Sequence, residues 1–144
     1  MIPPMPKSAA RRQHRSGCPI SMALELLGDA WSLLIVRDLM FKDRRTYNDF
    51  LTGGEGIASN VLADRLRKLE EANVIEKRRD PEDARRFLYR LSRKGIDLAP
   101  VLVELVIWSA RHEQTDAPPA VVRSMRNDRA AFLADVRRRW RGDS

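Results

Sequence analysis

The sequence contains few histidine, cysteine or carboxylate side chains at the spacings that catalytic or metal sites use. The two histidines, His14 and His112, lie in a polar N-terminal segment and at the end of a helical pattern. The two histidines are therefore too few and too far apart in the sequence to suggest a histidine-based metal or acid–base site within one chain. Glu70 and Glu71 are adjacent, but neighbouring helical residues point about 100° apart, which suits a solvated charge pattern better than paired carboxylates. We expect no enzyme activity, no metal and no cofactor.

Cys18 is the only cysteine, which excludes an intramolecular disulfide and favours a reducing, cytoplasmic compartment. It directly precedes Pro19 and an apolar helical pattern. The partial positive charge of a helix N-terminus, with Arg15 nearby, would favour a reactive thiolate there. The alternative is a small, half-buried residue at a subunit interface. The sequence leaves both roles open.

Three glycines, Gly53, Gly54 and Gly56, fall within four residues, a composition that can cradle a phosphate. However, no strand pattern precedes them and no Gly-Lys-Ser/Thr ending follows. We interpret them as a turn that reorients the chain between two helices.

The charge balance indicates an anionic partner. Lys and Arg number 27 against 20 Asp and Glu, giving a net charge of +7 and a pI near 10.3. Nucleic acid or an anionic membrane surface would fit this balance. The longest apolar stretch, residues 96–108, is interrupted by Asp97, Pro100 and Glu104 and is shorter than the ~20 residues that span a bilayer. Residues 1–16 lack the apolar core of a signal peptide. We expect a soluble protein with no membrane partner.

Composition divides the chain into three parts. Residues 1–17 form a basic flexible arm, which either solubilises the protein or contacts phosphates transiently. Residues 18–115 form the main domain. Residues 116–144 are expected to form a C-terminal amphipathic helix whose apolar stripe is Val121, Met125, Phe132, Val136 and Trp140.

Helical periodicity occupies most of the main domain. The predicted helices cover residues 19–27, 31–41 (capped by Asp29), 46–51, 59–73 and 92–112. Alternating residues predict two strands, 74–79 and 86–91, joined by the turn residues 80–83. Ser92 is the expected N-cap of the long last helix, and Pro100 should kink or weaken one of its turns. Most of this helix's circumference is apolar, so it needs burial on most sides.

This order of elements predicts a mostly α protein with one β-hairpin, a winged helix-turn-helix in which the helix 59–73 enters the major groove. Opposite the core stripe of that helix lie the candidates for contacts with base edges: Asn60, Asp64, Arg67 and Lys68. The candidates for phosphate or minor-groove contacts are Ser59, Arg65, Arg45 and the wing residues Arg79, Arg85 and Arg86.

Several linked motifs resemble the HxlR-type bacterial transcriptional regulators over about residues 18–110. The motifs are Cys18-Pro19-Ile20, Leu26-Leu27-Gly28-Asp29-x-Trp31, Arg37-Asp38-Leu39, Gly56-Ile57-x-Ser59, Leu62-x-x-Arg65-Leu66-x-x-Leu69-Glu70 and Tyr89-Arg90-Leu91-Ser92-x-Lys94-Gly95. The resemblance implies a homodimer held by the first and the long fifth helix. The corresponding interface residues are Ile20, Leu24, Val103, Val106, Ile107 and Trp108. It also implies a candidate redox-sensing role for Cys18, because some members sense oxidants or electrophiles through a cysteine at this position.

The sequence departs from the family pattern twice. Ala58 stands where many relatives have a Ser that can cap the recognition helix, so we expect Ser59 to be the cap. Residues 116–144 extend beyond the usual end, and the resemblance assigns them no role.

The function expected from these patterns is sequence-specific binding of double-stranded DNA by a homodimer that regulates, and more specifically represses, transcription. The alternative is a winged helix that binds only proteins, which would need an acidic or apolar outer face on residues 59–73 and an uncharged wing tip. RNA binding is less favoured, because the aromatic residues fall mainly on core stripes.

Overall fold

The computed structural model describes residues 13–142, so most of the predicted arm, residues 1–12, lies outside the described residues. The elements in chain order are α2 (Pro19–Leu27), α3 (Ser32–Phe41), α4 (Tyr47–Leu51), α5 (Ser59–Glu71), β1 (Ile75–Asp80), β2 (Asp83–Leu91), α6 (Arg93–Ile96), α7 (Ala99–His112), α8 (Pro119–Asn127) and α9 (Arg129–Gly142). The predicted class, a mostly α winged helix-turn-helix with one β-hairpin, is confirmed.

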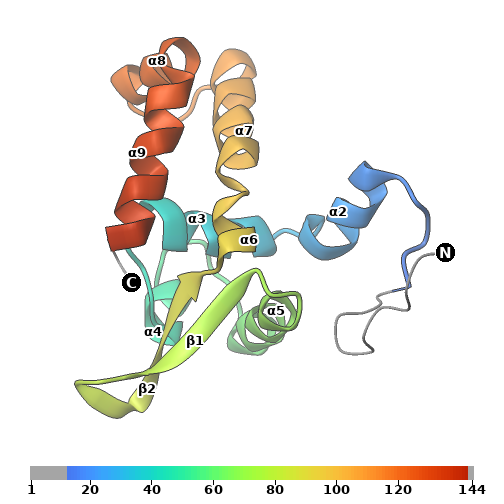
Figure 1. Ribbon diagram of the computed structural model, residues 1–144, viewed down its shortest axis with the longest axis vertical. Helices are drawn as coiled ribbons and strands as arrows, with labels where there is room; N and C mark the ends of the chain where they lie inside the picture. The colour runs from blue at the N-terminus through green and yellow to red at the C-terminus, as the bar shows by residue number, and fades with distance from the viewer. Residues whose placement is uncertain (1–12, 143–144) are drawn as a thin grey trace, which may run out of the picture.

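The elements form a lower and an upper part (Figure 1). The helices α4 and α5 and the β-hairpin lie at the lower end, with α3 above them. The helices α7, α8 and α9 stand together at the upper end and contact one another. The helix α2 projects sideways from α3, and none of its residues is buried.

The main core forms where one face of α5 meets α3 and the start of the hairpin. Leu62, Leu66 and Leu69 of α5 are buried there against Ile35 and Val36 of α3. Each fully buried leucine contributes roughly 1.5–3 kcal/mol to stability. This packing fixes which face of α5 remains outside.

Polar side chains bind the first N–H groups of α3 and α6. The N-cap of α3 is Trp31 and not the predicted Asp29, but the Asp29 carboxylate accepts hydrogen bonds from the backbone N–H of Trp31 at 3.2 Å and of Ser32 at 2.8 Å and so satisfies the first donors of the helix. The Ser92 hydroxyl accepts from the N–H of Gly95 at 3.1 Å, which confirms the cap before α6.

The hairpin pairs β1 antiparallel to β2, from Ile75 opposite Leu91 to Asp80 opposite Asp83. It is longer than predicted, because the second strand begins at Asp83 instead of residue 86. An irregularity in the register follows Arg79, whose guanidinium donates to the carbonyl of Ala84 at 2.6 Å. This side-chain bond holds the polar start of β2 in the hairpin. The sequence did not predict a strand there, because these residues show no alternation of apolar and polar side chains.

The single helix predicted for residues 92–112 is wrong. The chain forms α6 and α7, separated by Asp97 and Leu98. Pro100 lies in the first turn of α7 and has no N–H to donate to the carbonyl of Ile96. A first helical turn tolerates proline, so the helix restarts there.

The single C-terminal amphipathic helix is also wrong, because the chain breaks at Asp128 (φ −126°, ψ 44°) into α8 and α9. On α8 the buried valine is Val122, whereas Val121 is exposed. Together with Met125, this part of the chain covers one face of α7.

That cover changes the predicted dimer interface. Val103 is fully buried and Ile107 is 7% exposed, both packed with Met125 of the same chain. The prediction that these two residues lie in the dimer interface is therefore wrong, because residues beyond the family's usual end already bury them. Val106 is partly buried, whereas Trp108 and the α2 residues Ile20 and Leu24 remain exposed.

Within residues 13–142, no single helix has the length and apolar character to cross a membrane, although α2 and α3 pass that test together as a bent pair.

Candidate DNA-binding face

The helix α5 presents a polar face at the lower end of the molecule, beside the hairpin (Figure 1). The preceding turn depends on Gly54 and Gly56, which adopt φ values of 98° and 76° that other residues rarely take. Tyr47 of α4 then donates its hydroxyl to the carbonyl of Ser59 at 2.8 Å, which ties the start of α5 to α4. The glycine cluster is thus the turn of the helix-turn-helix.

The predicted cap at Ser59 is wrong. The N-cap is Ala58, Ser59 is the first residue of α5, and no side-chain cap bond forms there. Ser59 and Asn60 are exposed at this end. An uncapped helix N-terminus carries unpaired N–H groups and partial positive charge, which suit a DNA phosphate.

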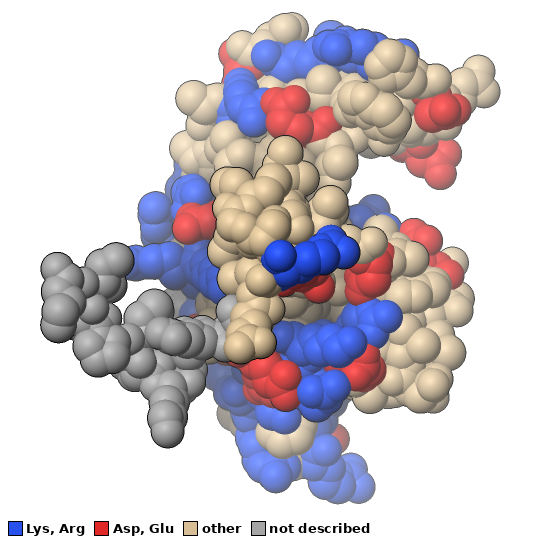
Figure 2. Space-filling model, turned by 90° about the vertical axis from the view of Figure 1, so that its right-hand side faces the viewer, with Lys and Arg blue, Asp and Glu red and all other residues tan. Residues whose placement is uncertain are grey.

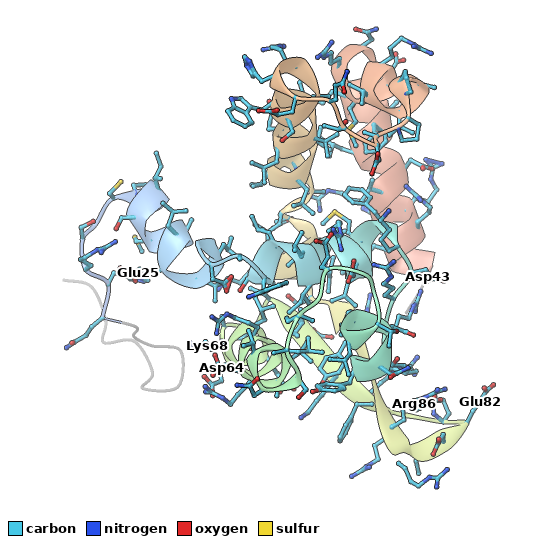
Figure 3. The ribbon with its side chains drawn as sticks, turned by 180° about the vertical axis from the view of Figure 1, so that it is seen from behind. Glu25, Asp43, Asp64, Lys68, Glu82 and Arg86 are labelled. Carbon is cyan, nitrogen blue, oxygen red and sulfur yellow. The ribbon has the colours of Figure 1, made fainter. Side chains whose placement is uncertain are left out.

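The base-edge candidates Asp64, Arg67 and Lys68 form one charged cluster on α5. Asp64 accepts from Arg67 at 2.7 Å and pairs with Lys68 at 3.2 Å, and Arg67 also pairs with Glu71 at 2.9 Å. Figure 3 shows Asp64 and Lys68 pointing outward from α5. The hydrogen bond from Arg67 lowers the pKa of Asp64, and Lys68 adds to this effect. Asp64 therefore orients the side chains of Arg67 and Lys68 and partly neutralises their positive charge.

Arg65 has a structural role within the chain, and its phosphate contact stays a prediction. Its Nε donates to Asp29 at 2.5 Å, and its guanidinium also pairs with Asp64. Burial by itself would raise the pKa of Asp29, but hydrogen bonds from Ser32, Trp31 and Arg65 lower it overall. Arg65 therefore anchors α5 to the segment that caps α3.

The wing arginines differ in how firmly the protein holds them. Arg86 forms two bonds to the buried Asp80, at 2.5 and 2.8 Å, and closes the hairpin turn. The N–H of Glu82 and then Arg86 lower the pKa of Asp80. Arg79 stacks 4.8 Å from the centre of the Phe87 ring. Arg85 has a side chain that is 92% exposed, and among the described residues it pairs only with its near neighbour Asp83, at 3.2 Å, so it is the most available of the three.

Arg45 lies just before α4 and pairs with Asp43 at 2.8 Å. Its carbonyl accepts from the N–H of Tyr89 in β2 at 2.8 Å, which fixes this segment beside the wing. Sequence reasoning missed Arg78 of β1, whose exposed side chain forms no hydrogen bond or ion pair within residues 13–142, although its charge acts on Asp80. Alternation along the strand could have found it, because Arg78 lies on the opposite face from Lys77 and Arg79.

Lys and Arg side chains gather at the lower end of the molecule, the end that holds α5 and the wing, with some Asp and Glu among them, and a second group of Lys and Arg lies at the upper end (Figure 2). Within the described part of the chain, no three His, Cys, Asp or Glu side chains are placed to hold a metal ion. The chemistry this face offers is charge complementarity and hydrogen bonding to a polyanion.

Comparison with known proteins decides the family. Residues 26–117 match the profile of the HxlR-like helix-turn-helix family. The chain belongs to the HxlR-like helix-turn-helix family. It is a DNA-binding transcriptional regulator by function class, as the winged helix and the basic face indicate.

Relatives named HTH-type transcriptional regulators occur in several bacteria. Rv3095 of Mycobacterium tuberculosis is 35% identical over 112 residues, covering 76% of this chain and 70% of the relative. The regulator sll1512 of Synechocystis is 35% identical over 88 residues, covering 61% and 64%. YodB of Bacillus subtilis is 32% identical over 93 residues, covering 64% and 82%. The chain thus matches slightly less than two thirds of the Synechocystis protein's length.

Solved structures agree with the fold. The crystal structure of PA1607, named as a candidate transcription factor, is 34% identical with a TM-score of 0.64, and the match covers 72% of this chain and 71% of that one. The reduced form of B. subtilis YodB is 29% identical with a TM-score of 0.56, covering 67% and 95%. YodB has also been solved bound to quinone and treated with diamide.

Proposed function

We propose that the protein represses transcription by binding an inverted-repeat DNA site as a homodimer, with one α5 in the major groove of each half-site. The proposal implies that the protein acts in the cytoplasm, where the bacterial chromosome lies. The observation that carries it is the placement of Asn60, Arg67 and Lys68 on the exposed face of α5, at the same end of the molecule as Arg85 of the wing. A helix in the major groove flanked by a basic wing is the docking geometry of this fold class.

The unpartnered helix α2 supports the homodimer. Its Ile20 is 71% exposed and its Leu24 56% exposed, whereas Leu105 and Trp108 of α7 are 45% and 62% exposed. Exposed apolar side chains of this size mark an interaction surface. The helix projects from the body, so it can reach a second copy (Figure 1).

An apolar groove fits that helix. The groove has a volume of about 290 Å³ and is lined mainly by Leu33, Leu34, Phe41, Leu102, Leu105 and Val106 of α3 and α7. In the proposed dimer, the α2 of each subunit packs Ile20 and Leu24 against α7 and this groove of the other. Such an exchange is isologous and closes at two subunits.

A redox response through Cys18 is the second part of the proposal. Cys18 is exposed and is the N-cap of α2. The Glu25 carboxylate of α2 accepts from the backbone N–H of Arg15 at 2.7 Å and lies 2.9 Å from Nδ1 of His14, so it holds the segment before Cys18 against α2. Modification of this thiol would disturb the helix that we place in the dimer interface.

Footprinting tests the DNA-binding proposal. Genomic fragments selected by the purified protein should share an inverted repeat whose half-sites lie about one helical turn, ~34 Å, or a multiple of it apart. Protection should weaken steeply with salt, because phosphate contacts release counterions. If no preferred site is found at ~100 mM salt, specific DNA binding is refuted. The alternative, in which the same face binds another protein, would then be favoured.

A further inference from the structure

The C-terminal helix α9 contacts the rest of the chain on both sides of the break between α6 and α7. The family match ends at residue 117, so this helix lies outside it. At the break, Pro100 has no N–H to continue the backbone hydrogen-bond ladder from α6 into α7, while Ile96 and Ala99 on either side of it are buried in the main core. On one side of it lie the wing and α5, and on the other lies α7 (Figure 1).

On the wing side of the break, Trp140 binds the end of β2. Its Nε1 donates to the carbonyl of Leu91 at 2.8 Å, and the Arg90 guanidinium lies 5.2 Å from the centre of its ring. Leu91 is the last residue of the wing strand. The C-terminal end of α9 is therefore fastened to the base of the wing.

The other contacts of α9 lie at the break, on α7 and in the two hydrophobic clusters, where Phe132 also packs against Phe41 of α3. Arg137 donates to Asp97, within the break, at 2.9 Å, and Arg129 pairs with Glu104 of α7. Between these ion pairs, Val136 is buried in the main core, while Phe132 packs against both this core and the smaller cluster around Val103. One rigid helix thus bridges the wing, the break and α7.

We propose that α9 is a strut that fixes the angle between the winged helix and α7, with Arg137 and Trp140 as positioning residues for DNA recognition. This inference rests on the proposed function, in which α7 belongs to the dimer interface and α5 to the DNA. In such a dimer, a rotation at residues 97–99 moves the two α5 helices relative to each other. The strut then sets the half-site spacing that the dimer accepts.

The test compares two variants of the full chain. The double variant Arg137→Ala/Trp140→Phe removes the bond to Asp97 and the indole donor while keeping an aromatic ring in place. The control is Arg138→Ala, which removes the same charge from α9 but, within residues 13–142, breaks only a pair with Asp135 of the same helix, at 3.2 Å. Binding is measured on inverted repeats whose spacer is lengthened or shortened by single base pairs, and on DNA with one half-site scrambled.

The double variant should bind the inverted repeat at its best spacing roughly two- to tenfold more weakly, as expected for lost hydrogen bonds. Its affinity for the single half-site should remain within about twofold of the wild type, and its preference for one spacing should flatten. The control should match the wild type on every DNA. Equal losses on the single half-site and on all spacings would show a general stability effect and would overturn the strut, as would an unchanged spacing profile.

Amide hydrogen exchange measured without DNA tests the strut independently of the proposed DNA-binding function. Amides of residues 96–102 should exchange faster in the double variant than in the control, while those of α5 stay unchanged. A wild type that binds no DNA specifically would refute the proposed function but leave this readout valid. Unchanged exchange across the break would refute the strut by itself. If the double variant fails to fold, Arg137→Ala alone serves for both measurements.

Discussion

Arg67 lies on the exposed face of α5 between two carboxylates, Asp64 and Glu71. These bonds raise the pKa of its guanidinium, and they pre-orient it while no DNA is bound. Arg85 at the wing tip has no comparable constraint. The two arginines should therefore serve different parts of recognition, one reading a base and one a phosphate.

Arg67→Ala should lower affinity for the specific site roughly 5- to 150-fold and relax the preference at one base pair, as the loss of a bidentate base contact does. Arg85→Ala should weaken binding to all sequences alike and reduce the salt slope by about 1. Titrations on specific and scrambled duplexes at several salt concentrations measure both effects. Equal effects of both variants on both duplexes would contradict this division.

Asp64→Asn should release Arg67 and Lys68 from their shared carboxylate and strengthen non-specific DNA binding severalfold, because a negative charge leaves the binding face. The matched control is Asp135→Asn, which removes the same charge from α9, where Asp135 pairs with Arg138 and Arg139. Anisotropy titrations with a scrambled duplex give the comparison. A rise of the same size in both variants would mean that net charge alone acts.

Oxidation of Cys18 should release DNA, through an intersubunit disulfide or a mixed disulfide with a small thiol. A direct bridge needs the two Cα atoms within about 7 Å, so mass spectrometry of the oxidised dimer distinguishes the two products. Titrations with diamide or a quinone should abolish binding by the wild type and spare Cys18→Ser. If the wild type keeps its affinity, or Cys18→Ser loses it identically, the cysteine is structural.

Among the elements, α4 is short and depends on its first turn. Thr46 accepts from the N–H of Asp49 at 3.1 Å, and the Asp49 carboxylate accepts from the N–H of Thr46 at 3.0 Å, which forms a reciprocal capping box. Burial alone would raise the pKa of Asp49, but the N–H groups of Arg45 and Thr46 lower it overall. Ionised Asp49 is therefore the better acceptor in this box, and the start of α4 is weakened when Asp49 is protonated.

Because the folded-state pKa of Asp49 is lowered, its contribution to stability is present above the unfolded value of about 3.9 and is lost as the pH falls below it. Asp49→Asn should lower the melting temperature by roughly 2–6 °C near neutral pH. The difference from the wild type should shrink between about pH 5 and pH 3. Thermal unfolding followed by circular dichroism measures this, and a pH-independent difference would contradict the role of the charge.

For the whole molecule, the exposed apolar faces of α2 and α7 should make it a dimer at micromolar concentration. Leu24→Glu places a charge on α2 that a dimer would bury without a partner, so it should dissociate the dimer and weaken binding to the inverted repeat. Val121→Glu on α8 is the control, since Val121 is exposed outside the groove and α2. Sedimentation velocity measures the state. A monomeric wild type, or a Leu24→Glu variant that remains a dimer, would refute the proposed interface.

Local chemistry was sufficient for much of the fold. The spacing of Leu62, Leu66 and Leu69 indicated both the recognition helix and its inner face, because a period of 3.6 residues aligns them on one stripe. The glycine cluster was equally readable, and so was the binding of the first N–H groups of α3 by Asp29, since positive φ and such side-chain bonds depend on single residue types. These features need no knowledge of distant parts of the chain.

Tertiary contacts decided the rest. Periodicity marks Val103 and Ile107 as apolar but cannot say whether a second subunit or the chain's own α8 covers them, because burial depends on which surface reaches them first. Arg65 and Arg67 are alike in sequence, yet Asp29, 36 residues away, binds Arg65. The contact of Trp140 with Leu91 likewise joins residues 49 positions apart, and no local pattern encodes that pairing.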